Sequence, residues 1–148
     1  ADEWMLVTAG DSSGFNTMTA SWGMMGEMWA SDVAVTVIRP QRYTFEFMEK
    51  NDYYTLCFFD DGFKKALAFC GAHSGRDCDK CKETGLTPVF ENGYTYFEQA
   101  KTVVVCRKVY VSDVDPAKLT DASIDASVYP KKDYHRAYIG KIEKVLVK

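Results

Sequence analysis

The sequence contains no apolar run that approaches the roughly 18 residues needed for a transmembrane helix. It also lacks a lysine-rich amphipathic segment that would lie on a membrane surface, and it carries no signal peptide. Basic residues number 18 against 21 acidic ones, and the net charge of −3 excludes the basic surface typical of nucleic-acid-binding proteins. We therefore expect neither a membrane nor a nucleic acid as a partner.

Cysteine is present, but in a number that does not suit a disulfide framework. The five cysteines are Cys57, Cys70, Cys78, Cys81 and Cys106. An odd count in a domain of this size argues against a set of paired bridges. Cys57 and Cys106 lie inside apolar runs, where cysteine acts as a small buried hydrophobic residue. We therefore expect a reducing compartment, the cytoplasm.

Composition is that of a folded domain. The chain has 148 residues, of which 47% are hydrophobic and 14% aromatic, enough to bury a core within one domain spanning residues 1–148. It contains no internal repeat, low-complexity tract or linker. The sequence goes within a few residues into the apolar run 5–7, so we expect that the first element of the natural protein is missing here.

Most segments read as strands. Strands are predicted at residues 4–9, 15–22, 33–38, 53–59, 94–97, 101–114 and 134–148, and short helices at 44–50 and 63–70, with a third ending at Gly85. Residues 23–29 are predicted to be a loop rich in Met and Trp, and residues 121–132 a polar connection. Because strands and helices do not alternate, we expect a mainly β protein, a closed antiparallel barrel with helices at its rim.

The strand at residues 15–22 offers the first candidate binding surface. Successive side chains in a strand face opposite ways. One face carries Asn16, Met18, Ala20 and Trp22, and the other carries Thr17, Thr19 and Ser21. Three adjacent hydroxyls can line a phosphate or a polyol. The alternative is an ordinary solvated strand face, because threonine suits strands.

Two further segments predict an anion site. Arg39 and Arg42 precede Tyr43 and Thr44, and Thr44 is expected to cap the helix that follows. Guanidinium groups and the free N–H groups of a helix start both suit phosphate oxygens. The loop from Ser74 to Lys80 adds a hydroxyl and further cations. The alternative is that these arginines are simply solvated in a loop.

A metal site is the main rival interpretation. Cys70, His73, Cys78 and Cys81 offer four ligands of the kind that zinc prefers, at ligand-type spacings. Cys70, however, is expected on the inner face of a helix, and the chain can build a core without a metal. The Cys-x-x-Cys spacing also suggests dithiol chemistry, but a helix rather than a strand precedes it. Cys78 and Cys81 as packing residues on a short helix are the third option.

Four motifs in a fixed order resemble one known family over nearly the whole chain. They are residues 15–23 (FNTMTASWG), 38–44 (IRPQRYT), 70–77 (CGAHSGRD) with Lys80, and 134–136 (YHR) with 138–140 (YIG). In this order they are similar to the flavin reductase-like, FMN-binding split-barrel proteins, and to the flavoredoxin-like branch in particular. The resemblance implies a six-stranded antiparallel Greek-key split barrel and a homodimer with FMN near the subunit interface.

The resemblance also implies roles for particular residues. Beside the flavin it places Asn16, Thr17, Met18, Thr19, Ala20, Ser21 and Trp22. At the phosphate it places Arg39, Arg42, Tyr43, Thr44, Ser74 and Lys80. Near the ring it places Tyr134, His135 and Tyr138. His135 is the one candidate catalytic group, and its alternative role is a hydrogen bond to a buried carbonyl or a dimer contact. Cysteine at both 78 and 81, and the absence of a leading helix, depart from the family pattern. The missing helix would either weaken the dimer or expose a strand edge.

Three functions follow. The first is an FMN-dependent oxidoreductase that takes hydride from NADH or NADPH and passes electrons to a flavin or another acceptor. The second is an FMN-binding electron carrier without nicotinamide activity. The third is the zinc-binding domain. Because no Gly-x-Gly-x-x-Gly fingerprint is present, a nicotinamide donor would have to stack on the flavin in an open cleft.

Overall fold

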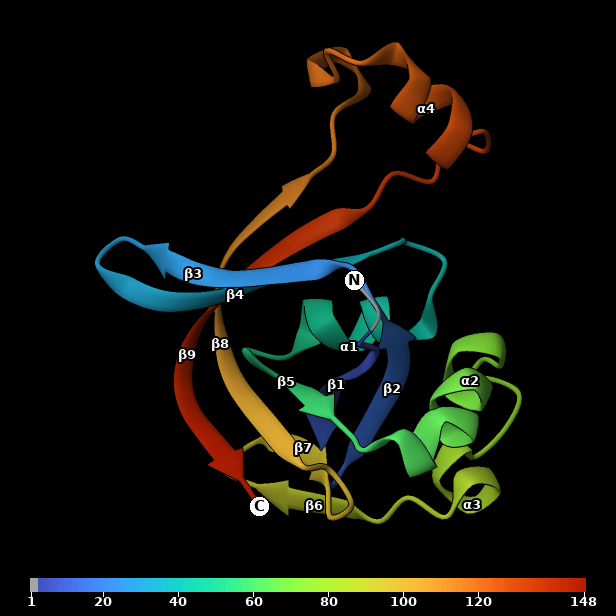
Figure 1. Ribbon diagram of the computed structural model, residues 1–148, viewed down its shortest axis with the longest axis vertical. Helices are drawn as coiled ribbons and strands as arrows, with labels where there is room; N and C mark the ends of the chain where they lie inside the picture. Colours follow the sequence, from blue (N-terminus) through green and yellow to red (C-terminus); the bar gives the residue numbers. More distant parts are fainter. Residues whose placement is uncertain (1–2) are drawn as a thin grey trace.

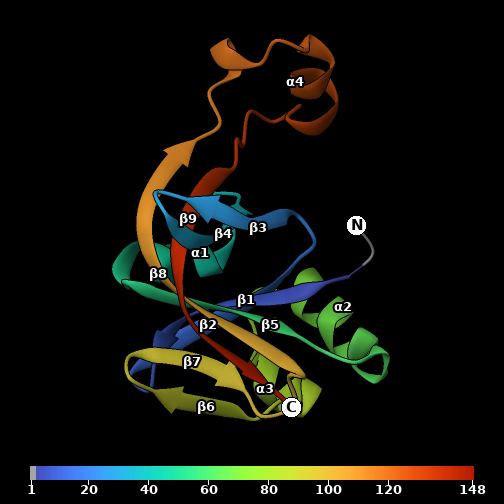
Figure 2. The same ribbon diagram turned by 60° about the vertical axis from the view of Figure 1, so that its left-hand side comes forward.

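The computed structural model describes residues 3–148, in which seven strands form one antiparallel sheet (Figure 1). The strand order is β2-β1-β5-β8-β9-β4-β3. The strands of this sheet are β1 (Met5–Asp11), β2 (Gly14–Ala20), β3 (Gly23–Met28), β4 (Ser31–Ile38), β5 (Tyr53–Phe58), β8 (Thr102–Asp113) and β9 (Arg136–Val147). A separate hairpin of β6 (Pro88–Glu91) and β7 (Tyr94–Phe97) lies at the end of the molecule opposite α4 (Figure 2). The mainly β, antiparallel prediction is confirmed.

The sheet has one strand more than the six expected, and the additional strand is β3. Residues 23–29 were expected to form a loop, yet β3 pairs with β4 along its whole length. The turn between them places Trp29 and Ala30 at φ of 54° and 50°. Two consecutive positive φ values are typical of a tight hairpin turn that matches the strand twist. Trp-Ala lacks the Asn-Gly signature of such turns, so local sequence did not reveal it.

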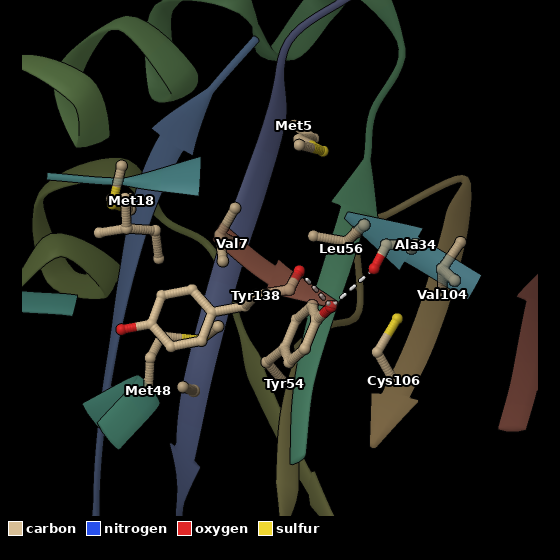
Figure 3. Close-up of a cluster of buried hydrophobic side chains, with 12 residues drawn as sticks. Met5, Val7, Met18, Ala34, Met48, Tyr54, Leu56, Val104, Cys106 and Tyr138 are labelled. Carbon is tan, nitrogen blue, oxygen red and sulfur yellow. Dashed lines mark hydrogen bonds between the residues drawn. The ribbon is translucent and has the colours of Figure 1, made fainter. Parts of the chain in front are cut away.

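Tyr54 organises the interior of the sheet (Figure 3). Its hydroxyl donates to the carbonyl oxygen of Ala34 at 3.0 Å and lies 3.5 Å from that of Tyr138, which ties β5 to β4 and β9. Gly140 allows this approach, because a Cβ there would lie 2.5 Å from the Tyr54 hydroxyl. Tyr54 and Tyr138 share their core cluster with Met5, Val7, Met18, Met48, Leu56, Val104 and Cys106.

The helices lie outside the sheet and differ slightly from expectation. They are α1 (Tyr43–Lys50), α2 (Lys64–Ala72), α3 (Lys80–Thr84) and α4 (Ala122–Val128), with short 3₁₀ turns at Asp61–Phe63 and Pro116–Lys118. Arg42 rather than Thr44 occupies the N-cap of α1, and α2 runs past Gly71 to Ala72, with His73 as its C-cap. Gly85 ends α3 at φ of 76°, as expected of a left-handed C-cap. None of the helices within residues 3–148 combines the length and the hydropathy needed to cross a membrane.

Beyond the sheet, β8 and β9 continue into an arm that carries α4 (Figure 1). The sequence predicted only a polar connection at residues 121–132. Asp121 caps α4 by accepting from the Ser123 N–H at 3.0 Å. No residue of α4 itself is buried. With only Ile124 and Val128 on one side of this short helix, its sequence pattern was too weak to predict it.

Candidate functional site

A groove runs from the end of β2 across the start of α1 to the end of α2. It consists of two cavities of about 210 and 230 Å³, which share Met18 and Arg42. The first is lined by Met18, Thr19, Ala20, Ser21, Trp22, Val37, Arg39, Arg42 and His135. The second is lined by Asn16, Met18, Gln41, Arg42, Tyr43, Thr44, Gly71, Ala72, His73, Ser74 and Lys80. Of the residues predicted for the site, all but Thr17, Tyr134 and Tyr138 therefore line one groove.

The hydroxyl face of β2 does not act as expected. The Thr17 side chain is buried, and its hydroxyl contacts the Thr8 hydroxyl at 2.8 Å and donates to the Val7 carbonyl. The Thr19 hydroxyl lines the groove but donates to the Leu67 carbonyl of α2 at 2.5 Å. These two hydroxyls hold β2 against β1 and α2. Only that of Ser21 makes no hydrogen bond within residues 3–148.

Lys80 is the strongest chemical feature of the groove. Its side chain is only 6% exposed, and its ammonium donates to the carbonyls of Thr17 at 2.7 Å and Cys70 at 2.8 Å. No carboxylate within residues 3–148 pairs with it. Burial lowers the pKa of this ammonium, with the charge of Arg42 as a smaller contribution. A buried cation without an acidic partner is costly, and an anionic ligand would offset that cost.

Arg42 adds a second uncompensated cation at the same place. Its guanidinium donates to the Gly71 carbonyl at 3.3 Å and has no carboxylate partner within the described residues. Burial lowers its pKa as well. Two such charges lie beside the Ser74 loop, in one cavity. The cavity therefore has the electrostatic character of an anion site.

The start of α1 supplies backbone donors to the same cavity. No side chain caps this helix; the N-cap N–H of Arg42 donates to the Arg39 carbonyl, and within the helix the first N–H with a protein acceptor is that of Phe45, which donates to the Arg42 carbonyl. Thr44 is not the cap; its hydroxyl accepts from the Asn16 amide at 2.9 Å, which joins β2 to α1. A Cβ at Gly75 would lie 2.0 Å from the Asn16 side-chain oxygen. Free N–H groups and the helix dipole favour an anion here.

Arg39 is engaged elsewhere. It forms an ion pair with Asp133 at 2.7 Å and donates to the Val128 carbonyl at 3.1 Å. Its guanidinium also lies 5.1 Å from the centre of the Tyr129 ring. These contacts fasten the α4 arm to the end of β4 and compensate the charge. The geometry therefore favours Arg42 and Lys80 over Arg39 as anion ligands.

The first cavity is flatter and more apolar in character. Trp22 is 52% exposed, and its ring centre lies 5.1 Å from that of His135. His135 is only 8% exposed, and its Nδ1 lies 2.7 Å from the Tyr129 hydroxyl. Burial, and then the charge of Arg39, lower the pKa of this imidazole below its usual 6.5. His135 is therefore neutral near pH 7 and can offer one N–H donor.

Two tyrosines expected near this cavity lie elsewhere. Tyr138 is fully buried in the core, and its hydroxyl donates to Glu49 at 3.2 Å. The Tyr134 hydroxyl donates to Asp125 in the arm at 2.6 Å. The family resemblance had placed both beside the ring with His135, but the Tyr138 side chain points into the core. Tyr129, which the sequence did not reveal, is the aromatic residue whose hydroxyl contacts the His135 imidazole; its one signal was an aromatic side chain in a polar segment.

The zinc alternative gains no support. Within residues 3–148, no three histidine, cysteine or acidic side chains come close enough to hold a metal. Cys70 is buried in the core, whereas His73 is exposed and stacks on Phe69 at 4.0 Å. All five cysteines have free thiols. The four residues are spaced like zinc ligands in the sequence, but the fold therefore does not bring them together around one metal position.

Comparison with known proteins places this groove in context. A family model described as the flavin reductase-like domain matches residues 1–148. No curated protein sequence is significantly similar to the chain. Similar solved structures include an FMN-binding protein from Thermus thermophilus, with 19% identity and a TM-score of 0.77. The alignment covers 99% of this chain and 71% of that one.

Two other solved structures share the fold. Flavoredoxin from Methanosarcina acetivorans is 17% identical, with a TM-score of 0.75 over 99% of this chain and 68% of that one. An NADH:FAD oxidoreductase from Streptomyces globisporus C-1027 is 13% identical, with a TM-score of 0.74 over 99% and 75%. Another similar structure is described as a flavin reductase with a split barrel domain. The split-barrel fold expected from the sequence motifs is thereby confirmed.

The anion site predicts a response to inorganic phosphate. Phosphate should raise the free energy of unfolding, by about 2.7 kcal/mol at 100 times its dissociation constant. Lys80→Met should weaken phosphate binding at least about tenfold, because a hydrogen bond to a charged group contributes roughly 1.5–3 kcal/mol. Denaturant unfolding with and without phosphate measures both effects.

Lys82→Met is the matched control, since Lys82 lies exposed on the same helix. It should keep the full response to phosphate. Equal stabilisation of the Lys80→Met and wild-type proteins would show that the anion binds elsewhere.

Proposed function

Because the chain belongs to the flavin reductase-like domain family, we propose that its groove binds FMN and that the protein is an NAD(P)H-dependent oxidoreductase. The observation that carries this proposal is the pair of uncompensated cations, Arg42 and Lys80, at one end of a groove whose other end presents Trp22. A phosphate monoester joined to a flat ring system would match both ends. Related folds that bind FMN or FAD support the same ligand class.

In this proposal the second cavity holds the phosphate. Arg42 and Lys80 would supply positive charge, the start of α1 would supply N–H groups, and Ser74 a hydroxyl. The backbone of the β2 strand and Met18 would lie along the chain that joins phosphate to ring. Asn16 and Thr44 would support the site through their mutual hydrogen bond.

The first cavity would hold the ring. A bound flavin supplies the hydride and electron chemistry. The chain contributes the apolar surfaces of Met18 and Trp22, which exclude water from part of the ring, and a neutral imidazole at His135. A nicotinamide would approach the ring from the open side of the groove. A flavin or protein electron acceptor would then take its place.

An FMN-binding electron carrier is the second candidate. Two structures similar to this chain are described as flavoredoxins, including that from Desulfovibrio vulgaris (Miyazaki F) at 19% identity and a TM-score of 0.75. A carrier and a reductase need the same flavin site. They differ in whether a nicotinamide reaches the ring.

The visible absorption spectrum decides between these functions. After incubation with FMN and desalting, the protein should keep a yellow band. Anaerobic addition of NADH or NADPH should then bleach that band if the protein is a reductase. Retention of the band with bleaching by dithionite alone would identify the carrier, and a colourless protein would contradict FMN binding.

We also propose a homodimer. Five large apolar side chains around β3 are exposed: Trp22, Met24, Met25, Met28 and Trp29. The three methionines lie on β3, an edge strand that is exposed along its whole length, and the two tryptophans flank it (Figure 1). Interfaces are enriched in aromatic residues and methionine, and an unpaired edge strand invites pairing. Trp22 also lines the first cavity, so a second copy there would lie beside the proposed ring site.

Sedimentation equilibrium tests the dimer. The wild-type protein should sediment as a dimer, and Met24→Glu should weaken association at least about tenfold, because it places a charge in an apolar contact. Val147→Glu is the control: Val147 is also exposed but pairs with Thr102 of β8, in the part of β9 that lies beyond its pairing with β4. A monomeric wild-type protein, or equal effects of both substitutions, would contradict this interface.

The thiols bear on the compartment. Cys57, Cys70 and Cys106 are buried, and Cys78 and Cys81 are half-buried, all of them unpaired. Free thiols persist in reducing surroundings. We infer a cytoplasmic location from this state.

A further inference from the structure

The contact between Tyr129 and His135 joins the α4 arm to the groove. The Tyr129 hydroxyl lies 2.7 Å from Nδ1 of His135. Tyr129 is 5% exposed and His135 is 8% exposed, so both groups are shielded from water. A hydrogen bond between two buried groups has a definite direction, and that direction decides what His135 presents to the groove.

Hydrogen-bond accounting shows which group donates. The Tyr129 hydroxyl has no other acceptor within residues 3–148. If Nδ1 carried the hydrogen, the buried phenol hydrogen would be left without a partner, at a cost of about 1–3 kcal/mol. The phenol therefore donates to Nδ1. Because a neutral imidazole carries one hydrogen, that hydrogen then lies on Nε2.

Nε2 is open to the first cavity. It makes no hydrogen bond within residues 3–148, and it is not one of the buried polar atoms that lack a partner in that range. His135 itself lines the cavity of about 210 Å³ with Trp22. An N–H group open to this cavity is available to a ligand acceptor.

We propose that Tyr129 is a positioning residue: it fixes His135 as the Nε2–H tautomer, which donates to a carbonyl oxygen of the ligand in the first cavity. That oxygen belongs either to a flavin ring or to the carboxamide of a nicotinamide. The identity of the ligand rests on the proposed function, whereas the tautomer does not.

Arg39 holds Tyr129 in this position. Its guanidinium lies over the Tyr129 ring, donates to the neighbouring Val128 carbonyl at 3.1 Å and pairs with Asp133. The Tyr134 ring also packs against the Tyr129 ring, with 4.9 Å between the ring centres. The charged groups near His135 are thus Arg39 and Asp133, and the former disfavours an imidazolium. The arm therefore supports a neutral histidine with a set orientation.

Nitrogen NMR of the ligand-free protein tests the tautomer. The chain contains only two histidines, and His73→Gln leaves the imidazole signals of His135 alone. At a pH where it is neutral, His135 should be the Nε2–H form. Tyr129→Phe keeps the ring and removes the donor, so it should produce a mixture of both tautomers.

Tyr134→Phe is the matched control, because it removes a hydroxyl from the same arm that bonds Asp125 instead of His135. It should leave the tautomer unchanged. A wild-type His135 with its hydrogen on Nδ1 would overturn the proposal. An equal tautomer change in Tyr134→Phe would also overturn it, because the effect would then reflect general loosening of the arm.

Binding measurements identify the ligand oxygen. Tyr129→Phe should weaken one interaction about twofold, because in an equal mixture of tautomers only about half of the protein carries the hydrogen on Nε2. If Tyr129→Phe binds FMN more weakly, the oxygen that accepts from His135 is a flavin carbonyl. If its FMN affinity is unchanged but its KM for NADH is raised, that oxygen belongs to the nicotinamide carboxamide. No change in either would overturn the donor role. Failure of the wild-type protein to bind FMN would contradict the proposed function while leaving the tautomer result intact.

Discussion

The buried ammonium of Lys80 is the constraint around which the groove is built. It joins three elements, because Lys80 begins α3 and donates to carbonyls of β2 and α2. The same contacts hold a positive charge out of water without an acidic partner among the described residues. Holding a cation in this way is costly, and a bound anion would offset part of that cost. Together with the contacts of Thr19 and Arg42 to α2, this group helps to set the position of α2 beside the second cavity.

Strong local signals made most of the fold predictable. The Asp60–Gly62 and Asn92–Gly93 segments end strands, and Gly85 ends α3 in the left-handed conformation. β3 and α4 were not predictable, for different reasons. β3 depends on a tight turn at Trp29 and Ala30 without typical turn residues, whereas α4 has no buried face and depends on the cap at Asp121.

The parts of the site that could be predicted are those where the side-chain type indicates a ligand and the order of the elements brings the residues together. The groove joins the end of β2, the start of α1 and the end of α2. The cationic side chains that were predicted to bind an anion line this groove. Thr17 could not be excluded from the sequence, since alternation assigns it a face but does not say that Thr8 covers it. Arg39 pairs with a residue 94 positions away, and Tyr129 reaches His135 through a folded arm. Such long-range contacts leave no trace in local pattern.

Comparison of FMN with riboflavin tests the central claim most directly, because the two ligands differ only in the phosphate. The wild-type protein should bind FMN at least about tenfold more tightly than riboflavin, and Lys80→Met should remove most of that difference. Riboflavin affinity should stay within about twofold, since Lys80 would not contact the ring. Equal affinities in the wild-type protein, or a preference for FMN that survives Lys80→Met, would contradict the assignment of Lys80 to the phosphate.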